Sequence, residues 1–322
     1  MKILITGITG FFGAYLAKKF SAIGEIHGLK RPNSDLRLLG GLVDRIHWTE
    51  GDVTDVLSLE EAFVGIDLII HSAGLVSFNP SDDKNLMKVN LEGTTNVVNV
   101  MLEKGVKKLI HISSVSALGK TPDLDILDEA HKWTTSPLNT SYAISKYLGE
   151  LEVWRAAQEG LDVIVVLPSV LLGKISDRSK SNGLYEHVLT GGHYYPAGSI
   201  NFLDVRDAAE LIFQLYEKAV WGEKFILNQQ SLSYKSFFDK MAGVFGKNAP
   251  EKKITPSMLK ILLAGIWLGK KLGFTKSELN TKTLNLAQIG VFMDNQKVQN
   301  LLQFQYTPLE ETFAWAVANE KI

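Results

Sequence analysis

The chain has 322 residues, 45% of them hydrophobic, which is enough for one large α/β domain or two smaller ones with a sizeable core. Its formal net charge of −1 excludes a global field that would attract nucleic acid or an anionic membrane. The absence of cysteine excludes disulfides, thiolate nucleophiles and cysteine-ligated metals. The seven histidines show no pair at metal-ligand spacing with an acidic partner, so we expect no metal site. The first apolar run begins at residue 2, so we expect no signal peptide and a cytoplasmic protein.

The first two-thirds of the chain alternates apolar runs with helical patterns. The apolar runs predict strands at 2–6, 25–29, 45–49, 67–71, 107–113 and 161–167. The stretches between them predict helices near 11–23, 57–64, 84–104 and 140–159. This alternation predicts a doubly wound parallel sheet with right-handed crossovers, a Rossmann-type α/β fold.

The pattern changes after Pro168. A loop with one short helix, a longer helix, a strand and a mainly helical tail are predicted in turn, at 168–200 (helix 182–190), 204–220, 224–228 and 231–319. We therefore expect a first domain of 1–167 plus 201–228. A smaller, mainly helical second domain would contain 168–200 plus 229–322.

An uncharged run of nine residues, 261–269, lies inside a predicted apolar helix at 257–269. It is too short to span a bilayer, which takes about 20 residues, so we expect no stable membrane insertion. An interfacial helix and a hydrophobic substrate wall that includes Trp267 remain alternatives to a helix packed on its own domain.

A glycine-rich turn joins the first strand to the first helix. It reads Thr6-Gly7-Ile8-Thr9-Gly10-Phe11-Phe12-Gly13. Gly7 permits a sharp turn, Gly10 leaves room for a pyrophosphate, and Gly13 lets the helix pack closely on the sheet. Free N–H groups at the helix start favour a dianionic ligand. The turn therefore predicts a dinucleotide site in the first domain, and an ordinary glycine turn is the alternative.

A Tyr/Lys pair and two serines are the candidate catalytic residues. Tyr142 and Lys146 are four residues apart on one predicted helix face. A phenol ionises near pH 10, and a nearby ammonium favours the phenolate, so the pair predicts a proton donor for a carbonyl being reduced. Ser113 and Ser114 end the fifth strand, where a hydroxyl can hydrogen-bond a substrate oxygen. Taken alone, the Tyr142/Lys146 pair is equally typical of an ordinary helix surface, and the two serines are typical of residues that cap backbone groups.

The glycine motif, the serine and Tyr-x-x-x-Lys, in this order, resemble the short-chain dehydrogenase/reductase superfamily. The length and the long C-terminal segment resemble its extended branch, which includes the NAD-dependent epimerases and dehydratases. The resemblance implies that Tyr142 is the general acid–base and that Lys146 lowers its pKa and holds the nicotinamide ribose. It implies that Ser114, rather than Ser113, polarises the carbonyl, and that Asn90 supports a proton relay.

The resemblance also implies a set of cofactor contacts. They are Gly7, Thr9, Gly10, Phe11, Phe12 and Gly13 in the turn, Asp52 and Val53 near the adenine, Ser72, Ala73 and Gly74 at the fourth strand, and Ser113, Tyr142, Lys146, Pro168 and Val170 at the catalytic end.

The end of the second strand indicates which cofactor is used. An acid there bonds the ribose of NAD, whereas a cation accommodates the phosphate of NADP. The strand runs into Lys30 and Arg31 with no acid at the expected place, which favours NADP. Asp35, slightly later, keeps NAD as the alternative.

Local motifs help to separate reductases from nucleotide-sugar enzymes within the extended branch. The stretches Ser113-Ser114-Val115, Ala117-Leu118-Gly119 and Val166-Leu167-Pro168 differ from the sugar-enzyme patterns. They resemble dihydroflavonol reductases and hydroxysteroid dehydrogenases, as does the run from Pro168 to Gly173. We therefore expect NADPH-dependent reduction of a small-molecule ketone or aldehyde, or oxidation of the corresponding alcohol.

Two other functions stay open. A nucleotide-sugar epimerase or dehydratase with tightly bound cofactor could use Arg178 and Lys180 on a diphosphate. A non-catalytic dinucleotide sensor would keep the fold, although it need not keep Ser114, Tyr142 and Lys146.

Several expectations concern partners and packing. No basic stripe with aromatics is present, so no nucleic-acid partner is expected. Relatives often dimerise through helices corresponding to 84–104 and 140–159, so a homodimer is expected. Its face could include Val97, Val98, Met101, Leu148 and Leu151, which could equally pack on the sheet. For His71 and His111 we expect packing or hydrogen bonding rather than catalysis.

Overall fold

A parallel sheet forms the centre of the computed structural model, which describes residues 1–120, 126–260, 263 and 281–318. Seven strands pair in the order β11-β7-β5-β4-β1-β2-β3. Their bounds are β1 Lys2–Thr6, β2 Glu25–Lys30, β3 His47–Glu50, β4 Leu68–His71, β5 Lys108–Ile112, β7 Asp162–Pro168 and β11 Glu223–Leu227. The chain winds outward from β1 to β3 and then returns to the other side of β1 at β4. This order confirms the doubly wound α/β fold, with its topological switch point between β1 and β4.

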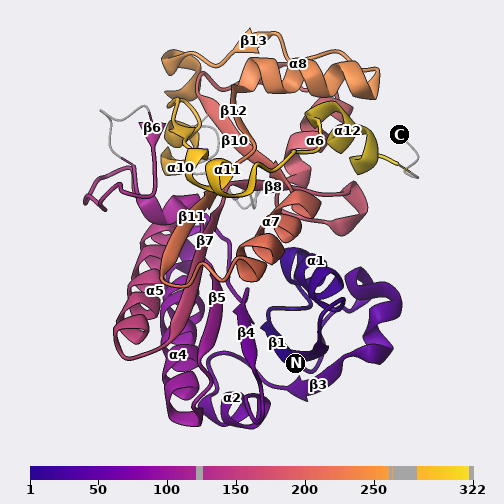
Figure 1. Ribbon diagram of the computed structural model, residues 1–322. Helices are drawn as coiled ribbons and strands as arrows, with labels where there is room; N and C mark the ends of the chain where they lie inside the picture. The colour runs from indigo at the N-terminus through magenta and orange to yellow at the C-terminus, as the bar shows by residue number, and fades with distance from the viewer. Residues whose placement is uncertain (121–125, 261–262, 264–280, 319–322) are drawn as a thin grey trace.

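Helices cover both faces of the sheet, because successive side chains of a strand point to opposite faces. Ile3 and Ile5 share a core with α1 and α7, whereas Leu4 shares a core with α2, α4 and α5 (Figure 1). Strands buried on both faces explain the continuous apolar runs of the sequence. The helices are α1 Phe11–Phe20, α2 Val56–Ala62, α4 Gly93–Lys104, α5 Ser141–Gln158 and α7 Val205–Glu217.

The helix expected at 84–104 contains an irregular segment. It begins as α3 (Asp83–Leu86), continues through a π-helical segment at Met87–Glu92 and ends as α4. π-Segments inside helices are frequent at functional sites. Here the segment carries Asn90.

A second body lies beyond the carboxyl ends of the central strands, at the top of Figure 1. It contains a three-stranded sheet in the order β12-β10-β8, with an aromatic core between this sheet and the helices around it. Its main elements are β8 Val170–Leu172, β10 Ser199–Asp204, β12 Gln230–Ser233, α6 Asn182–Leu189, α8 Tyr234–Phe245 and α12 Leu309–Ala316. The helix expected at 182–190 is confirmed. The domain boundary expected at residue 201 falls inside β10, and α7 then packs on the central sheet.

The sequence missed the short strands of this second body. The remaining elements are β6 Ile126–Leu127, β9 Tyr194–Tyr195, β13 Lys252–Lys253, β14 Phe292–Met293, α10 Thr281–Leu286 and α11 Gln296–Leu302, together with 3-10 turns at Arg37–Arg45, Pro80–Asp82, Val115–Leu118 and Ile175–Asp177. Strands of two to four residues are too short to display the alternation that identifies a strand.

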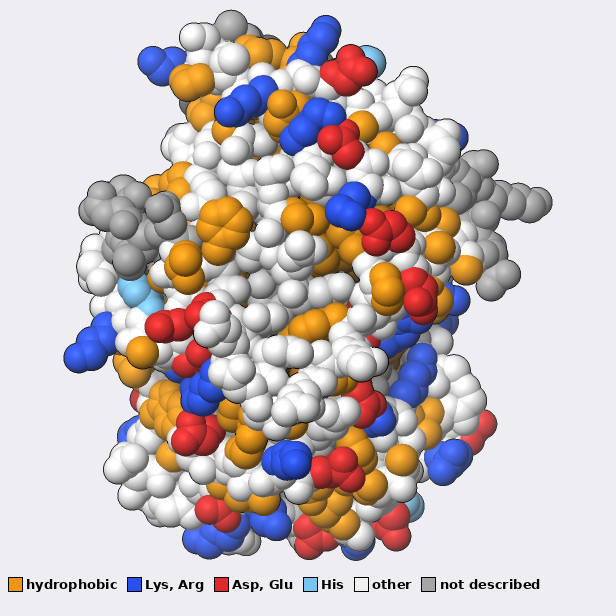
Figure 2. All heavy atoms as spheres, turned by 45° about the horizontal axis from the view of Figure 1, so that its top comes forward, with side chains coloured by type: hydrophobic (Ala, Val, Ile, Leu, Met, Phe, Trp, Pro, Cys, Tyr) orange, Lys and Arg blue, Asp and Glu red, His pale blue; other side chains and the backbone are white. Residues whose placement is uncertain are grey.

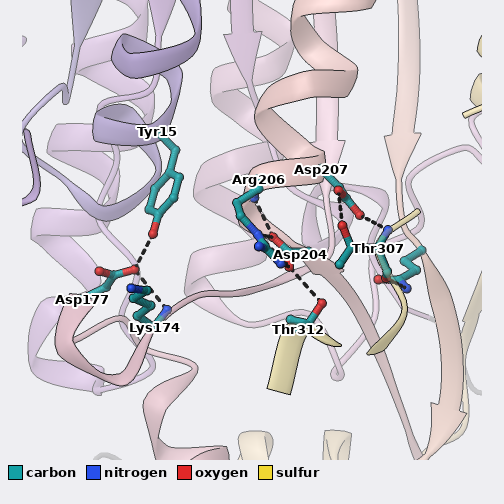
Figure 3. A network of polar contacts seen from close by, with 9 residues as sticks. Tyr15, Lys174, Asp177, Asp204, Arg206, Asp207, Thr307 and Thr312 are labelled. Carbon is teal, nitrogen blue, oxygen red and sulfur yellow. Dashed lines mark hydrogen bonds and ion pairs between the residues drawn. The ribbon is translucent and has the colours of Figure 1, made fainter. Parts of the chain in front are cut away.

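Two carboxylates, Asp177 and the buried Asp204, connect the second body to the first (Figure 3). Tyr15 of α1 donates a hydrogen bond of 2.8 Å to Asp177, which also accepts from the backbone N–H of Lys174. Asp204, with no exposed surface, pairs with Arg206 and accepts from Thr312 of α12 at 2.8 Å. The first contact ties the loop after β8 to α1, the helix that follows the glycine turn, and the second ties the C-terminal helix α12 to the start of α7.

The apolar run 261–269 falls outside the described residues, apart from residue 263, so the structure does not test the predictions for it. Among the described helices, none has the length and apolar character needed to cross a bilayer. On the face shown in Figure 2, Lys and Arg side chains are interspersed with Asp and Glu.

Phe313 provides a test of the second core. Its side chain is fully buried and meets Phe237, Tyr185 and Phe245 edge-on or nearly so. We expect Phe313→Ala to lower the free energy of unfolding by about 3–5 kcal/mol, because it removes apolar contacts and leaves a cavity. Urea denaturation followed by circular dichroism measures the change. Phe292→Ala, at a side chain that is 44% exposed, is the matched control and should change stability far less. Equal losses in the two variants would contradict this account of the core.

Candidate active site

The glycine turn brings the backbones of β1 and β4 into close contact. Gly7 has a φ of +68°, and a Cβ there would lie 2.6 Å from the backbone N of Ala73. A Cβ at Gly13 would lie 2.2 Å from the carbonyl oxygen of Gly7. Neither position therefore accepts a side chain without displacing backbone.

The same turn leaves the start of α1 open to an anion. Gly10 is the N-cap of α1, and no side chain caps the helix there. Its N–H donates to the oxygen of Gly7, while the first-turn N–H groups beyond it remain available. Gly10 is exposed, so a phosphate can approach the backbone. The turn therefore fits the pyrophosphate of a dinucleotide.

Ser114 and Tyr142 meet at the carboxyl end of β5. Ser114 follows β5 as the N-cap of a 3-10 turn, where its Oγ accepts from the N–H of Ser116 at 3.1 Å. It also hydrogen-bonds Tyr142, on the first turn of α5. Burial raises the pKa of Tyr142 above its usual value of 10, and the hydrogen bond with Ser114 opposes this shift. Tyr142 is therefore a neutral phenol. The resemblance implied that Lys146 lowers the pKa of Tyr142, whereas burial raises it.

Lys146 lies one helical turn after Tyr142. Its Nζ donates to the carbonyl oxygen of Ile112 at 2.7 Å. The same Nζ lies 3.9 Å from the point where a Cβ at Gly74 would be. Burial lowers the pKa of the Lys146 ammonium to about 8, and the nearby Glu150 carboxylate opposes that decrease. Lys146 therefore lies next to the loop that follows β4, one helical turn from Tyr142.

Glu150 is the site residue that the sequence analysis missed. Its side chain is buried, and its carboxylate accepts from Ser113 at 2.7 Å and Trp154 at 3.3 Å. Lys224 lies 3.6 Å from the same carboxylate. Ser113 therefore faces Glu150, whereas Ser114 faces Tyr142. The signal was present, because Tyr142, Lys146 and Glu150 follow each other at four-residue spacing on one helix face.

Asn90 holds the loop that follows β4. Its Oδ1 accepts from the N–H of Leu75 at 2.7 Å, and its Nδ2 donates to the oxygen of Leu75 at 3.0 Å and to Ser145 at 2.9 Å. Both amide hydrogens are used in this way. These contacts position residues 73–75 next to Lys146, and a role of Asn90 in a proton relay stays a prediction.

The other expected cofactor contacts line the carboxyl edge of the sheet. The Asp52 carboxylate accepts hydrogen bonds from the backbone N–H and the hydroxyl of Thr54. Asn96 donates to the carbonyl oxygen of Val53. Thr9, Phe11, Ser72 and Ala73 are partly exposed, whereas Phe12 and Pro168 are buried. Lys30 lies at the end of β2, with Nζ 4.0 Å from Glu50, and Arg31 is exposed just beyond it. Val170, the first residue of β8, is 40% exposed.

Two histidines lie beneath the site. His71 contacts Thr6 at 2.7 Å and Thr94 at 2.9 Å, and burial lowers its pKa to about 3. His111 is buried beside it, with ring centroids 5.4 Å apart, and neither of its ring nitrogens has a hydrogen-bond partner in the described part of the chain. Both side chains occupy packed positions, as expected.

The residues considered for a dimer face divide between core and surface. Val97, Val98 and Met101 are fully buried and pack with the sheet, which is the second of the two expected alternatives. On α5, Leu151 is 44% exposed.

Comparisons with known proteins agree with this geometry. The sequence profile of the NAD dependent epimerase/dehydratase family matches residues 3–227. "Sterol demethylase protein B" of Methylococcus capsulatus is 28% identical over 99% of this chain and 98% of its own length. "Putative dihydroflavonol 4-reductase" of Synechocystis sp. is 29% identical over 83% of this chain and 78% of its own. The crystal structure of gox2253 superposes with a TM-score of 0.83 at 28% identity, covering 98% of this chain and 96% of that one.

The family profile covers the whole central sheet, including the glycine turn, Ser114, Tyr142 and Lys146. The expected resemblance to dihydroflavonol reductases is also confirmed among the relatives. The chain therefore belongs to the NAD dependent epimerase/dehydratase family and is an NAD(P)-dependent enzyme of the extended short-chain dehydrogenase/reductase class.

Proposed function

We propose that the protein is an NADPH-dependent reductase of a ketone or aldehyde, or catalyses oxidation of the corresponding alcohol. The observation that carries the proposal is the buried, neutral Tyr142, hydrogen-bonded to Ser114 and one helical turn from Lys146. A neutral phenol is the form that can give a proton to a carbonyl oxygen as the carbon is reduced.

Each side chain has a separate task. When bound, NADPH supplies the hydride that adds to the carbonyl carbon. The Ser114 Oγ accepts from the N–H of Ser116, so the hydroxyl can turn its single hydrogen from Tyr142 to the substrate oxygen. Tyr142 gives its proton to that oxygen and is left as a phenolate. Lys146 adds a positive charge nearby, which favours the same anion.

The surroundings of Tyr142 favour an apolar substrate. The Phe78 ring meets the Tyr142 ring edge-on at 5.9 Å and stays 38% exposed. Val76, on the loop after β4, and Val170, the first residue of β8, are 38% and 40% exposed. Exposed apolar groups beside a catalytic residue are typical of pockets that bind hydrophobic ligands. The relative named as a sterol demethylase protein, matched along nearly its whole length, supports a bulky ring system as substrate.

The end of β2 favours NADP over NAD. Lys30 and Arg31 bring two positive charges to the place where a 2′-phosphate would lie. Asp35, the acid that could have bonded a ribose diol, is held by Arg37 in a bidentate ion pair that lowers the Asp35 pKa to about 2. Its carboxylate is therefore already engaged. The positive charge of Arg178 contributes to the same lowering of the Asp35 pKa.

We also propose that the protein forms a homodimer. Since Val97, Val98 and Met101 pack inward, an interface along α4 and α5 would use the exposed Ile144 and Leu151 instead.

Tyr142→Phe tests the reaction. With purified protein, NADPH oxidation is followed with a ketosteroid, a dihydroflavonol and a short-chain ketone, and we expect kcat to fall by at least about 10²-fold because the proton donor is removed. Tyr147→Phe, on the same helix but stacked on Trp133, should keep its activity. Conversion of UDP-glucose without net cofactor oxidation would instead indicate the epimerase alternative. Bound cofactor without turnover of any of these substrates would indicate the sensor alternative.

Arg31→Ala tests the cofactor. Loss of one charged hydrogen-bond donor to a phosphate should raise KM for NADPH by roughly 10–100-fold. KM for NADH should stay unchanged, because NADH has no 2′-phosphate. Steady-state kinetics with both cofactors gives the comparison, and Arg45→Ala, an exposed cation at the end of a 3-10 turn, is the control. A parallel rise for NADH would count against NADP selectivity.

Glu150→Gln tests the charge balance around Lys146. The Glu150 carboxylate raises the pKa of Lys146 against the effect of burial, so its removal should lower that pKa below about 8. The fall of kcat/KM at alkaline pH, where Lys146 loses its proton, should then begin at lower pH than in the wild type. Glu152→Gln, which removes a partner of Arg155 on the same helix, should leave the pH profile in place. An unchanged profile for Glu150→Gln would show that Glu150 has no influence on this step.

A further inference from the structure

Three potential metal ligands meet at the edge of the sheet opposite the glycine turn. β2 and β3 run parallel, with His27 and His47 as direct partners in the register. Glu25 precedes His27 by two residues, so it points to the same face. Glu25 and His47 are the first residues of their strands, which places the group at the amino ends, whereas the catalytic residues lie at the carboxyl ends.

The distances within this group are short. One ligand atom from each of Glu25, His27 and His47 lies within 4.8 Å of the other two. The imidazole rings of the histidines stack with centroids 4.8 Å apart at an interplanar angle of 24°. Nε2 of His27 is buried and has no hydrogen-bond partner in the described ranges of the chain. A buried ring nitrogen without a partner is uncommon, and a ligand would satisfy it.

We propose that Glu25, His27 and His47 form a binding site for a divalent transition-metal ion, with Zn²⁺ as the best match. Two imidazoles and one carboxylate are an established donor set for Zn²⁺. Two donors on one Zn²⁺ are at most about 4.4 Å apart, given metal–ligand distances of 2.0–2.2 Å. Rotation of the exposed Glu25 and His47 side chains closes the remaining gap, because the strand pairing already fixes their backbones.

The site would join two strands and lies away from Tyr142, at the amino ends of the strands. β3 is a four-residue strand at the edge of the sheet and pairs only with β2 among the described strands. An ion shared by Glu25, His27 and His47 would join the start of β3 to β2. One group opposes binding: Lys2 of β1 pairs with Glu25 in the register, and its charge acts on His27.

The test is Zn²⁺ binding to chelator-treated full-length protein, measured by isothermal titration calorimetry. We expect one site in the wild type and at least tenfold weaker binding in His47→Gln, since even the loss of outer partners of metal ligands costs roughly 10–100-fold. His193→Gln, which removes an exposed histidine outside the group, is the matched control and should bind as the wild type does. Lys2→Gln should bind Zn²⁺ more tightly.

Two further readouts separate a specific site from scattered surface binding. Zn²⁺ should raise the melting temperature of the wild type and of His193→Gln, but not of His47→Gln. Co²⁺ should give visible absorption bands in the wild type that are lost in His47→Gln. Because His47 is exposed, His47→Gln should fold normally, and unchanged reductase kinetics would verify this. Equal Zn²⁺ affinity in the wild type and His47→Gln, or equal losses in the two histidine variants, would overturn the proposal.

Discussion

The close approach of the backbones at Gly7 and Ala73 is the constraint on which the site depends. Any side chain at Gly7 would collide with the strand end at Ala73. Thr6 reinforces this contact, because its Oγ1 accepts from the N–H of Ala73 at 3.2 Å. Asn90 holds the next residue but one, Leu75, and reaches Ser145 beside Lys146. One continuous series of short contacts therefore links the glycine turn to Lys146.

Burial shifts the pKa values of Tyr142 and Lys146 in opposite directions. It disfavours the phenolate of Tyr142 and the ammonium of Lys146, so both shift toward their neutral forms. A neutral Tyr142 suits proton donation, but a neutral Lys146 would no longer favour the phenolate that is left behind. Glu150 counters the second effect alone, since its carboxylate acts on Lys146 and its hydrogen bonds go to Ser113 and Trp154. A buried carboxylate at this position thus keeps the lysine charged without making the tyrosine acidic.

The parts of the fold and site that the sequence predicts are those encoded by local patterns. The glycine turn, the apolar runs of the central strands and the spacing of Tyr142 and Lys146 are all of this kind. The resemblance, rather than a local pattern, assigned Ser114 and Tyr142 to the same carbonyl, and the structure brings the two hydroxyls together. Two other contacts could not be predicted in this way: the hydrogen bonds between Asn90 and Leu75, and the pairing of His27 with His47. They depend on packing and strand register, which bring together residues far apart in the chain. The short strands of the second body carry too few residues for a periodic signal.

The loop after β8 connects the second body to the helix of the glycine turn. Asp177 in this loop accepts from Tyr15, on the helix that begins at the glycine turn. The next residue, Arg178, takes a left-handed backbone conformation and acts electrostatically on Asp35, beyond the end of β2. The loop therefore contacts α1 directly and acts on Asp35 only through the charge of Arg178. Because Gly173 at the base of the loop packs against Phe11, a change in the backbone of this loop acts directly on the first turn of α1.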